Sequence, residues 1–138
     1  MQNVQKQLQK ARKVWVGYWL LGIAVLHTIY AGVFFGPVYA DIVQRGIINA
    51  VGQDPMTGAA VWFAIFGVMM AMLAAAVVPM ERSGQHQGLR NVGLGLLLLC
   101  VAGVALMPAS GFWLGFPAAI ALMMKAQALA KDENHPLG

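Results

Sequence analysis

The chain has 138 residues, of which 59% are hydrophobic and 10% are charged, and its formal net charge at pH 7 is +4. A soluble domain carries about 45–50% apolar and about 25% charged residues, so this composition excludes an ordinary soluble fold. No polar domain is present that could carry a basic face for nucleic acid, so a nucleic-acid partner is not expected.

Long stretches without charge predict four membrane spans, over about residues 14–35, 55–78, 89–107 and 111–125. No Asp, Glu, Lys or Arg occurs within residues 14–39, 55–80 or 91–124. We therefore predict an all-α integral membrane four-helix bundle that forms a single domain over residues 1–138 and is surrounded by the lipid bilayer.

The first span follows a basic segment, residues 1–13, which we expect to extend it as an amphipathic surface helix. Gly36 and Pro37 should end this span. Residues 38–51 then place apolar side chains along one stripe and polar ones opposite. This pattern predicts a short interfacial helix in the first outer loop.

Asp54 followed by Pro55 is a helix-start signal for the second span, which should end at Pro79. A polar loop over residues 81–90 would then lead to the third span.

The turn over residues 108–111 leads into the fourth span, with Ser110 as its expected N-cap. Because this span is short for a bilayer, the Lys125 side chain is expected to reach the membrane surface.

Lysine and arginine positions predict the orientation. Eight of the nine lie at the two ends of the chain or between the second and third spans, and only Arg45 lies on the opposite side. Since positive residues favour the cytoplasmic side, we expect a multi-pass protein with its N- and C-termini in the cytoplasm.

Three signatures recur in a known family: His27-Thr28, Asp54-Pro55 before Trp62-Phe63, and the turn Leu106-Met107-Pro108-Ala109-Ser110-Gly111-Phe112-Trp113. From about Trp15 to Met124, the chain resembles small bacterial four-span membrane proteins that are grouped as a domain of unknown function. The resemblance implies the four-span fold and a bacterial inner (plasma) membrane, and it implies no activity.

Catalytic and metal-binding patterns are missing from the sequence. It contains no paired carboxylates in the spans, no Cys-x-x-Cys, no His-Glu-x-x-His and no phosphate-binding glycine loop before a lysine. We therefore predict no catalytic residues, no metal ligands and no cofactor, and an enzyme is not favoured.

His27 is the unusual polar position, because it lies deep in the first span, where polar groups are costly. It could serve packing as a neutral imidazole bonded to another helix, contact a ligand or a proton, or ligate a haem or metal. We expect a neutral ring that donates to a carbonyl such as that of Trp113, which Pro117 would leave unbonded.

Aromatic residues are concentrated in the outer half of the spans. They could form an interfacial belt, or they could line an outward-facing pocket. For the pocket, the predicted ligand-binding residues are His27, Tyr30, Phe66, Trp113 and Phe116.

Three functions remain open on the sequence. The first is binding or minor transport of a small hydrophobic or lipid-like ligand in the aromatic pocket, and the second is a structural or accessory subunit of a membrane complex. The third is a haem-binding redox component, for which a homo-oligomer would bring two His27 side chains to one axis. Stripes of small residues on the second and fourth spans would serve packing within the chain or between copies.

Overall fold

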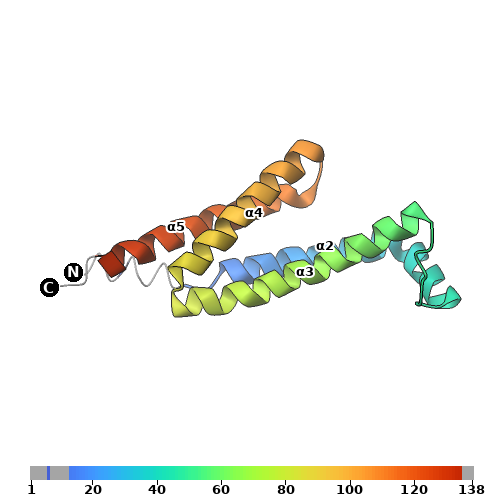
Figure 1. Ribbon diagram of the computed structural model, residues 1–138, viewed down its shortest axis with the longest axis horizontal. Coiled ribbons are helices and arrows are strands. Elements are labelled where there is room, and N and C mark those ends of the chain that lie inside the picture. Colours follow the sequence, from blue (N-terminus) through green and yellow to red (C-terminus); the bar gives the residue numbers. More distant parts are fainter. Residues whose placement is uncertain (1–5, 7–12, 135–138) are drawn as a thin grey trace. The chain divides into compact units, whose positions relative to one another are not determined.

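The computed structural model describes residue 6 and residues 13–134, and every regular element in them is helical. In chain order these are α2 (Val16–Arg45), α3 (Pro55–Ser83), α4 (His86–Leu106), the short 3-10 helix η1 (Gly111–Leu114) and α5 (Gly115–Asn134) (Figure 1). The prediction of an all-α four-helix fold is confirmed. The amphipathic helix expected over residues 1–13 falls outside the described residues, apart from Lys6 and Lys13.

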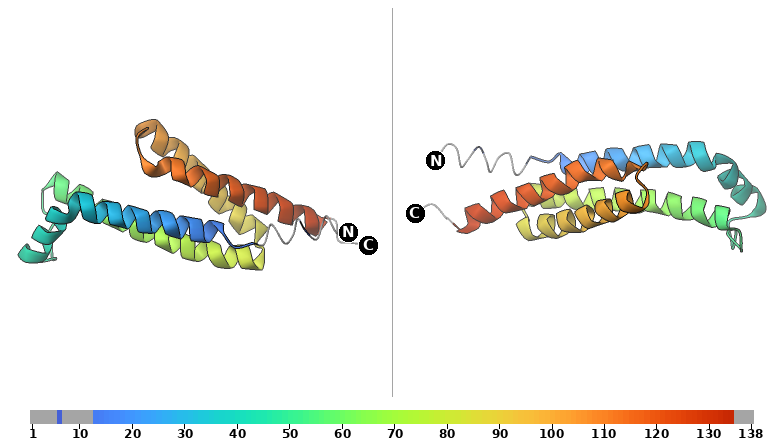
Figure 2. Two further views of the ribbon diagram at one scale, coloured as in Figure 1. Left: turned by 180° about the vertical axis from the view of Figure 1, so that it is seen from behind. Right: turned by 90° about the horizontal axis from the view of Figure 1, so that it is seen from above.

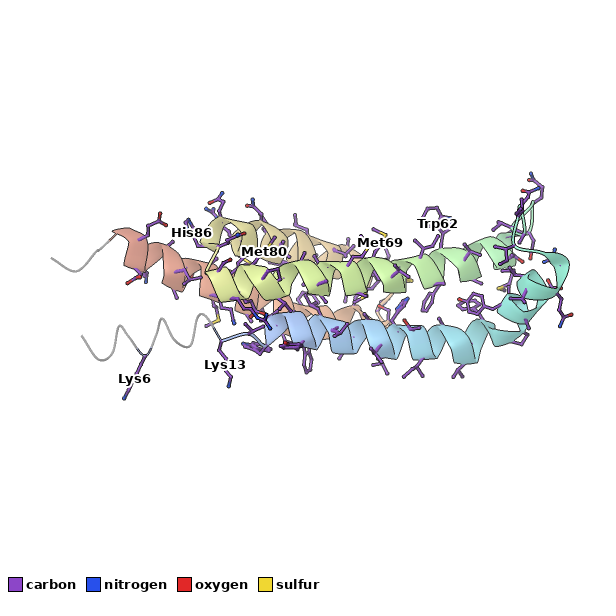
Figure 3. All side chains as sticks on the ribbon, turned by 90° about the horizontal axis from the view of Figure 1, so that it is seen from below. Lys6, Lys13, Trp62, Met69, Met80 and His86 are labelled. Carbon is purple, nitrogen blue, oxygen red and sulfur yellow. The ribbon has the colours of Figure 1, made fainter. Side chains whose placement is uncertain are left out.

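All four helices are long and apolar enough to cross a membrane, the fourth being counted from Gly111 through η1 to Glu133. Their outer faces are apolar, since Phe34, Trp62 and Met72 are 65%, 70% and 67% exposed. Figure 3 shows Trp62 on the side of α3 that faces away from α2. Large apolar side chains at this exposure are stable in lipid but unfavourable in water. The chain is therefore a multi-pass membrane protein.

The described chain divides into two compact units. The α4–α5 unit comprises the residues up to Leu20 and those from Leu73 onward, so it includes the first turn of α2 and the end of α3. The hairpin unit, Leu21–Met72, comprises the rest of α2, the following loop and the first part of α3. The single domain over residues 1–138 stays a prediction.

Helix α2 continues through Gly36 and Pro37, where the sequence predicted an end. A proline inside a helix removes one backbone donor and bends the helix, and membrane helices tolerate this. The C-terminal part of α2, drawn in teal, turns away from the axis of the part before it (Figure 2). The short helix predicted over residues 38–51 is therefore not a separate element, because residues 38–45 continue α2 and the loop over residues 46–53 contains only bends and turns.

Helix α3 also continues past its predicted end at Pro79 and reaches Ser83. It stops at Gly84, whose φ of 69° lies in the left-handed region that glycine adopts without strain. The Gln85 N–H donates to the Met80 carbonyl at 3.1 Å, the pattern of a Schellman helix end. Two residues that the sequence assigned to a loop, Glu81 and Arg82, are thus helical.

Asp54 caps the start of α3, as the sequence predicted. The Asp54 carboxylate accepts hydrogen bonds from the backbone N–H groups of Met56 at 3.2 Å and Thr57 at 3.1 Å. Pro55 occupies the first helical position, where its missing N–H costs no intrahelical bond.

The fourth span does not begin as an α-helix. Ser110 precedes η1 with an extended backbone, but its side chain makes no capping hydrogen bond, so the predicted cap is wrong. Pro117 lies in the first turn of α5, where backbone N–H groups have no intrahelical partner. Pro117 therefore does not free the Trp113 carbonyl, as the sequence had suggested. Helix α5 also runs to Asn134, beyond the expected end near residue 125.

In the α4–α5 unit, α4 packs against both η1 and α5. Glycines make this close approach feasible: a Cβ on Gly93 would lie 3.0 Å from the Leu122 Cβ. Gly103 faces the Phe112 ring and Gly115 faces the Cys100 thiol so closely that no Cβ would fit without a shift. Small residues at such contacts are typical of packed membrane helices.

Candidate functional site

A fully buried carboxylate lies near the end of α3. Glu81 has 0% exposure, and its Oε1 atom is 2.5 Å from Nζ of Lys125 on α5. The Lys125 residue is only 6% exposed, so the expectation that its side chain reaches the membrane surface is wrong. The reason is that α3 continues past Pro79 and carries Glu81 into the core, where a buried carboxylate requires a cation.

The same carboxylate caps the start of α2. The Gly17 N–H donates to Oε2 at 2.9 Å, and the N–H groups of Val16 and Trp15 donate to Oε1 at 3.3 and 3.4 Å. The first N–H groups of a helix have no intrahelical partner, and the positive end of the helix dipole favours an anion. Residues 11–15 contain no Ser, Thr, Asp or Asn, so the cap that the local sequence lacks comes from α3.

Lys125 makes two further contacts with the segment that precedes α2. Its ammonium donates to the Lys13 carbonyl and lies 5.8 Å from the centre of the Trp15 ring, within the range of a cation–π interaction. The Glu81–Lys125 pair thus joins the start of α2 to α3 and α5. The two charged groups pair with each other, and the carboxylate also caps α2. This arrangement indicates a structural role for the pair.

His27 is the centre of the second cluster, in the hairpin unit. Its Nε2 atom lies 2.9 Å from the Phe63 carbonyl oxygen, and its ring stacks on the Phe63 ring with centroids 4.0 Å apart and planes inclined by 14°. The Phe66 ring is 5.5 Å away. The predicted bond from His27 to a backbone carbonyl is therefore present, but the acceptor is Phe63 and not Trp113.

Gly67 explains why the imidazole can reach that carbonyl. A Cβ at this position would lie 3.1 Å from Cδ2 of His27 and 3.3 Å from Oγ1 of Thr28. Glycine leaves this space open one helical turn after Phe63. The Thr28 hydroxyl is satisfied within α2, because it donates to the Ala24 carbonyl at 2.9 Å.

Further aromatic rings extend the cluster along α2. The Tyr30 ring lies 5.9 Å from the Phe63 ring and stacks on Phe34 at 5.0 Å. Phe35 lies 5.4 Å from the Phe63 ring, and the Tyr39 hydroxyl donates to the Ala60 carbonyl at 2.8 Å. Tyr30 and Phe34 remain 50% and 65% exposed, so part of this aromatic surface is open.

The five predicted ligand-binding residues are distributed over both units. In the hairpin unit, the His27 ring contacts Phe63 and Phe66, and Tyr30 contacts Phe63; these four residues form the imidazole cluster. Phe63 was not among the predicted site residues, although its spacing from Gly67 by one helical turn could have indicated it.

Trp113 and Phe116 belong to the α4–α5 unit, where their rings lie 5.7 Å apart. Trp113 Nε1 donates to the Pro108 carbonyl at 2.9 Å, which closes the turn. The neighbouring Leu114 carbonyl accepts a bond of 3.0 Å from Trp19 Nε1. Their part in ligand binding stays a prediction.

The imidazole cluster also specifies where the His27 proton lies. A carbonyl oxygen can only accept a hydrogen bond, so Nε2 must carry the hydrogen in its contact with Phe63. Within residues 13–134, the other ring nitrogen, Nδ1, forms no hydrogen bond. Among the same residues, no three His, Cys, Asp or Glu side chains lie close enough to hold a metal ion.

A shallow groove in the α4–α5 unit is a weaker candidate. It encloses about 250 Å³ and is lined by Leu73, Val92, Gly95, Leu96 and Leu99. These residues offer no polar side chain to orient a ligand, whereas specific sites combine apolar walls with a few polar groups. The groove therefore lacks the polar group that a specific ligand site needs.

The family of unknown function DUF6463 matches residues 11–129, which is most of the chain, and the chain belongs to this family. Comparison with curated proteins and with solved structures finds no match in either.

Proposed function

We propose that this member of DUF6463 binds a small hydrophobic or lipid-like molecule in the membrane, at the imidazole cluster of its hairpin unit. The hydrogen bonding of the two His27 ring nitrogens is the observation that supports this proposal. One nitrogen bonds the Phe63 carbonyl, whereas Nδ1 has no hydrogen-bond partner among the described residues.

His27 is half-buried, and its Nδ1 atom lies in a helix that is long and apolar enough to cross a membrane. In hydrocarbon no water is available to bond such an acceptor. Leucine or phenylalanine would fill a similar volume without a polar atom. A molecule that bonds Nδ1 would supply the partner, and polar residues inside membrane spans commonly mark substrate pathways.

The surrounding rings supply the apolar part of such a site. The Phe63 and Phe66 rings lie 4.0 and 5.5 Å from the imidazole, and the half-exposed Tyr30 ring is 5.9 Å from Phe63. Ligand sites in general combine aromatic walls with a small number of polar groups. One imidazole nitrogen beside three aromatic rings has this composition.

Native mass spectrometry of protein released from its own membranes in mild detergent tests the proposal. We expect a retained non-protein mass on the wild-type chain, its loss in His27→Leu and its retention in His27→Gln, because glutamine can both donate and accept. His86→Leu is the matched control, since His86 lies in the α4–α5 unit beside Glu133 at 3.2 Å. Equal retention in His27→Leu, or no retained mass on the wild type, would contradict the proposal.

The same spectrum addresses the accessory-subunit alternative. A partner protein at fixed stoichiometry without any small molecule would favour that alternative. A single chain that carries a small molecule favours ligand binding.

The bacterial inner membrane and cytoplasmic termini belong to the same proposal. They are supported by the sequence resemblance and by the eight-to-one bias of lysine and arginine.

A further inference from the structure

We infer that the ligand is an uncharged apolar molecule whose head group carries a hydroxyl, and that this hydroxyl donates to Nδ1 of His27. The inference rests on the proposed function and adds the chemical class of the ligand. It follows from the hydrogen bonding of the two ring nitrogens of His27 and from the position of that ring in α2.

The bond to Phe63 fixes the tautomer. Because the Phe63 carbonyl at 2.9 Å has no hydrogen to give, the hydrogen between the two groups belongs to Nε2. In a neutral imidazole only one nitrogen is protonated. The other nitrogen, Nδ1, then presents a lone pair and can only accept.

In the described part of the chain, the surroundings of the ring offer no counter-ion to a charged imidazole. His27 lies eleven positions after Val16 (27 − 16 = 11), about 16 Å along the helix at about 1.5 Å per residue. Its hydrogen bond and its ring contacts among the described residues are to the Phe63 carbonyl and to the rings of Phe63 and Phe66, none of which is an anion. A charge without a counter-ion is costly at such a depth in a membrane.

An accepting nitrogen selects among hydrophobic molecules. Ethers, esters, ketones and quinones present only acceptors, so they would leave Nδ1 unbonded. Phenols, hydroquinones and long-chain or isoprenoid alcohols present one hydroxyl hydrogen on an apolar body, and a hydroxyl can satisfy the nitrogen. The shared chemistry is therefore a hydrogen-bond donor on an apolar body, and we assign it to a hydroxyl, carried either by an aromatic ring or by an aliphatic chain.

Two pairs of probes that differ in one hydrogen-bond donor test this inference on the full-length protein in lipid nanodiscs. The aromatic pair is 4-nonylphenol and its methyl ether 4-nonylanisole, and the aliphatic pair is 1-dodecanol and its methyl ether. Binding is titrated by native mass spectrometry, with empty nanodiscs correcting for partition into lipid. The variants are His27→Leu, His27→Gln and the control His86→Leu.

We expect the wild type to bind at least one hydroxyl probe about 2- to 10-fold more tightly than its ether, the range given by one net hydrogen bond. The ratio should fall to about 1 in His27→Leu, with ether binding unchanged, and should persist in His27→Gln and His86→Leu. Preference within the aromatic pair alone would indicate a phenol or hydroquinone, and preference within both pairs would indicate any apolar alcohol.

Two results would overturn the inference, and they differ in what they say about the proposed function. If the wild type binds hydroxyl and ether probes equally, ligand binding stands but the hydroxyl class is wrong. If none of the four probes binds above empty nanodiscs, the inference and the proposed site fail together.

Discussion

Glu81 and Lys125 are 44 residues apart in the chain, yet their charged atoms lie 2.5 Å apart with the carboxylate fully buried. This carboxylate also accepts hydrogen bonds from the first N–H groups of α2. One side chain on α3 therefore caps the start of α2 and pairs with a lysine on α5.

Replacing Glu81 by Gln should destabilise the protein strongly. The amide can still accept from the α2 backbone, but the buried Lys125 ammonium then has no counter-charge. Removing one partner of a buried pair costs about 3–5 kcal/mol. Steric trapping or detergent titration of unfolding in bicelles would measure the change.

A double variant separates the charge from the packing. Glu81→Gln combined with Lys125→Met should recover much of the loss, because no unpaired charge remains buried. The control is Arg45→Ala, which breaks the 2.5 Å ion pair with Asp41, whose side chains are 54% and 53% exposed. We expect this variant to lower the free energy of unfolding by only about 0.3–0.5 kcal/mol. If Glu81→Gln and Arg45→Ala lowered the free energy of unfolding by equal amounts, the buried pair would contribute no more to stability than an exposed one.

Gly67→Ala should disturb the imidazole cluster. The added Cβ would lie 3.1 Å from Cδ2 of His27, so the ring must move and its bond to Phe63 weakens. Overpacking of this kind costs about 1–3 kcal/mol.

The matched control is Gly32→Ala in α2, where nothing lies within 4 Å of the new Cβ. That variant should be neutral or more stable by up to about 1 kcal/mol, since alanine favours a helix. Thermal unfolding in one detergent compares both, and a similar fall in both midpoints would be inconsistent with this geometry.

The start of α3 should lose stability in acid. Hydrogen bonds from the Thr57 hydroxyl and from the Thr57 and Met56 N–H groups hold the pKa of Asp54 below its usual value of 3.8. Because the pKa is lower in the folded state, the carboxylate's contribution is complete above the unfolded pKa and is lost as the pH falls through the folded one. We expect the thermal midpoint to fall below about pH 4. Asp54→Asn keeps a capping oxygen without the charge and should show a smaller dependence on pH. Identical pH profiles for the two proteins would refute this assignment.

Cysteine labelling would test the orientation. In a Cys100→Ala background, a cysteine at Asn49 should react with a membrane-impermeant maleimide on intact cells, whereas one at Gln85 should react only after lysis. Both positions are exposed in the structure, so failure to react would reflect the membrane and not burial. The reverse pattern would place the termini outside, against the charge bias.

The sequence predicted those features that depend on local composition. Four apolar segments predicted four helices, since a membrane requires every backbone group to be bonded within its own segment. The Asp54 cap was also predictable, because its partners lie two and three residues away. The helix ends predicted at Pro37 and Pro79 were wrong, because a membrane helix can bend at a proline without ending there.

The candidate site was only partly accessible from the sequence. His27 was identifiable as a polar residue in an apolar segment, and a neutral ring bonded to a carbonyl followed from the cost of charge in lipid. The identity of that carbonyl depends on the register between α2 and α3, which brings Phe63 within 2.9 Å and places Gly67 beside the ring. No spacing within one segment determines the register between two helices.

The sequence by itself therefore determined the membrane helices, the α3 cap and the unusual position of His27. Only the tertiary structure showed that Glu81, assigned to a loop, is fully buried and that Lys125 is its partner. The physical reason is that hydropathy and capping signals act over a few residues. A buried charge is stable only where helices distant in sequence bring a counter-charge and free backbone donors to the same point.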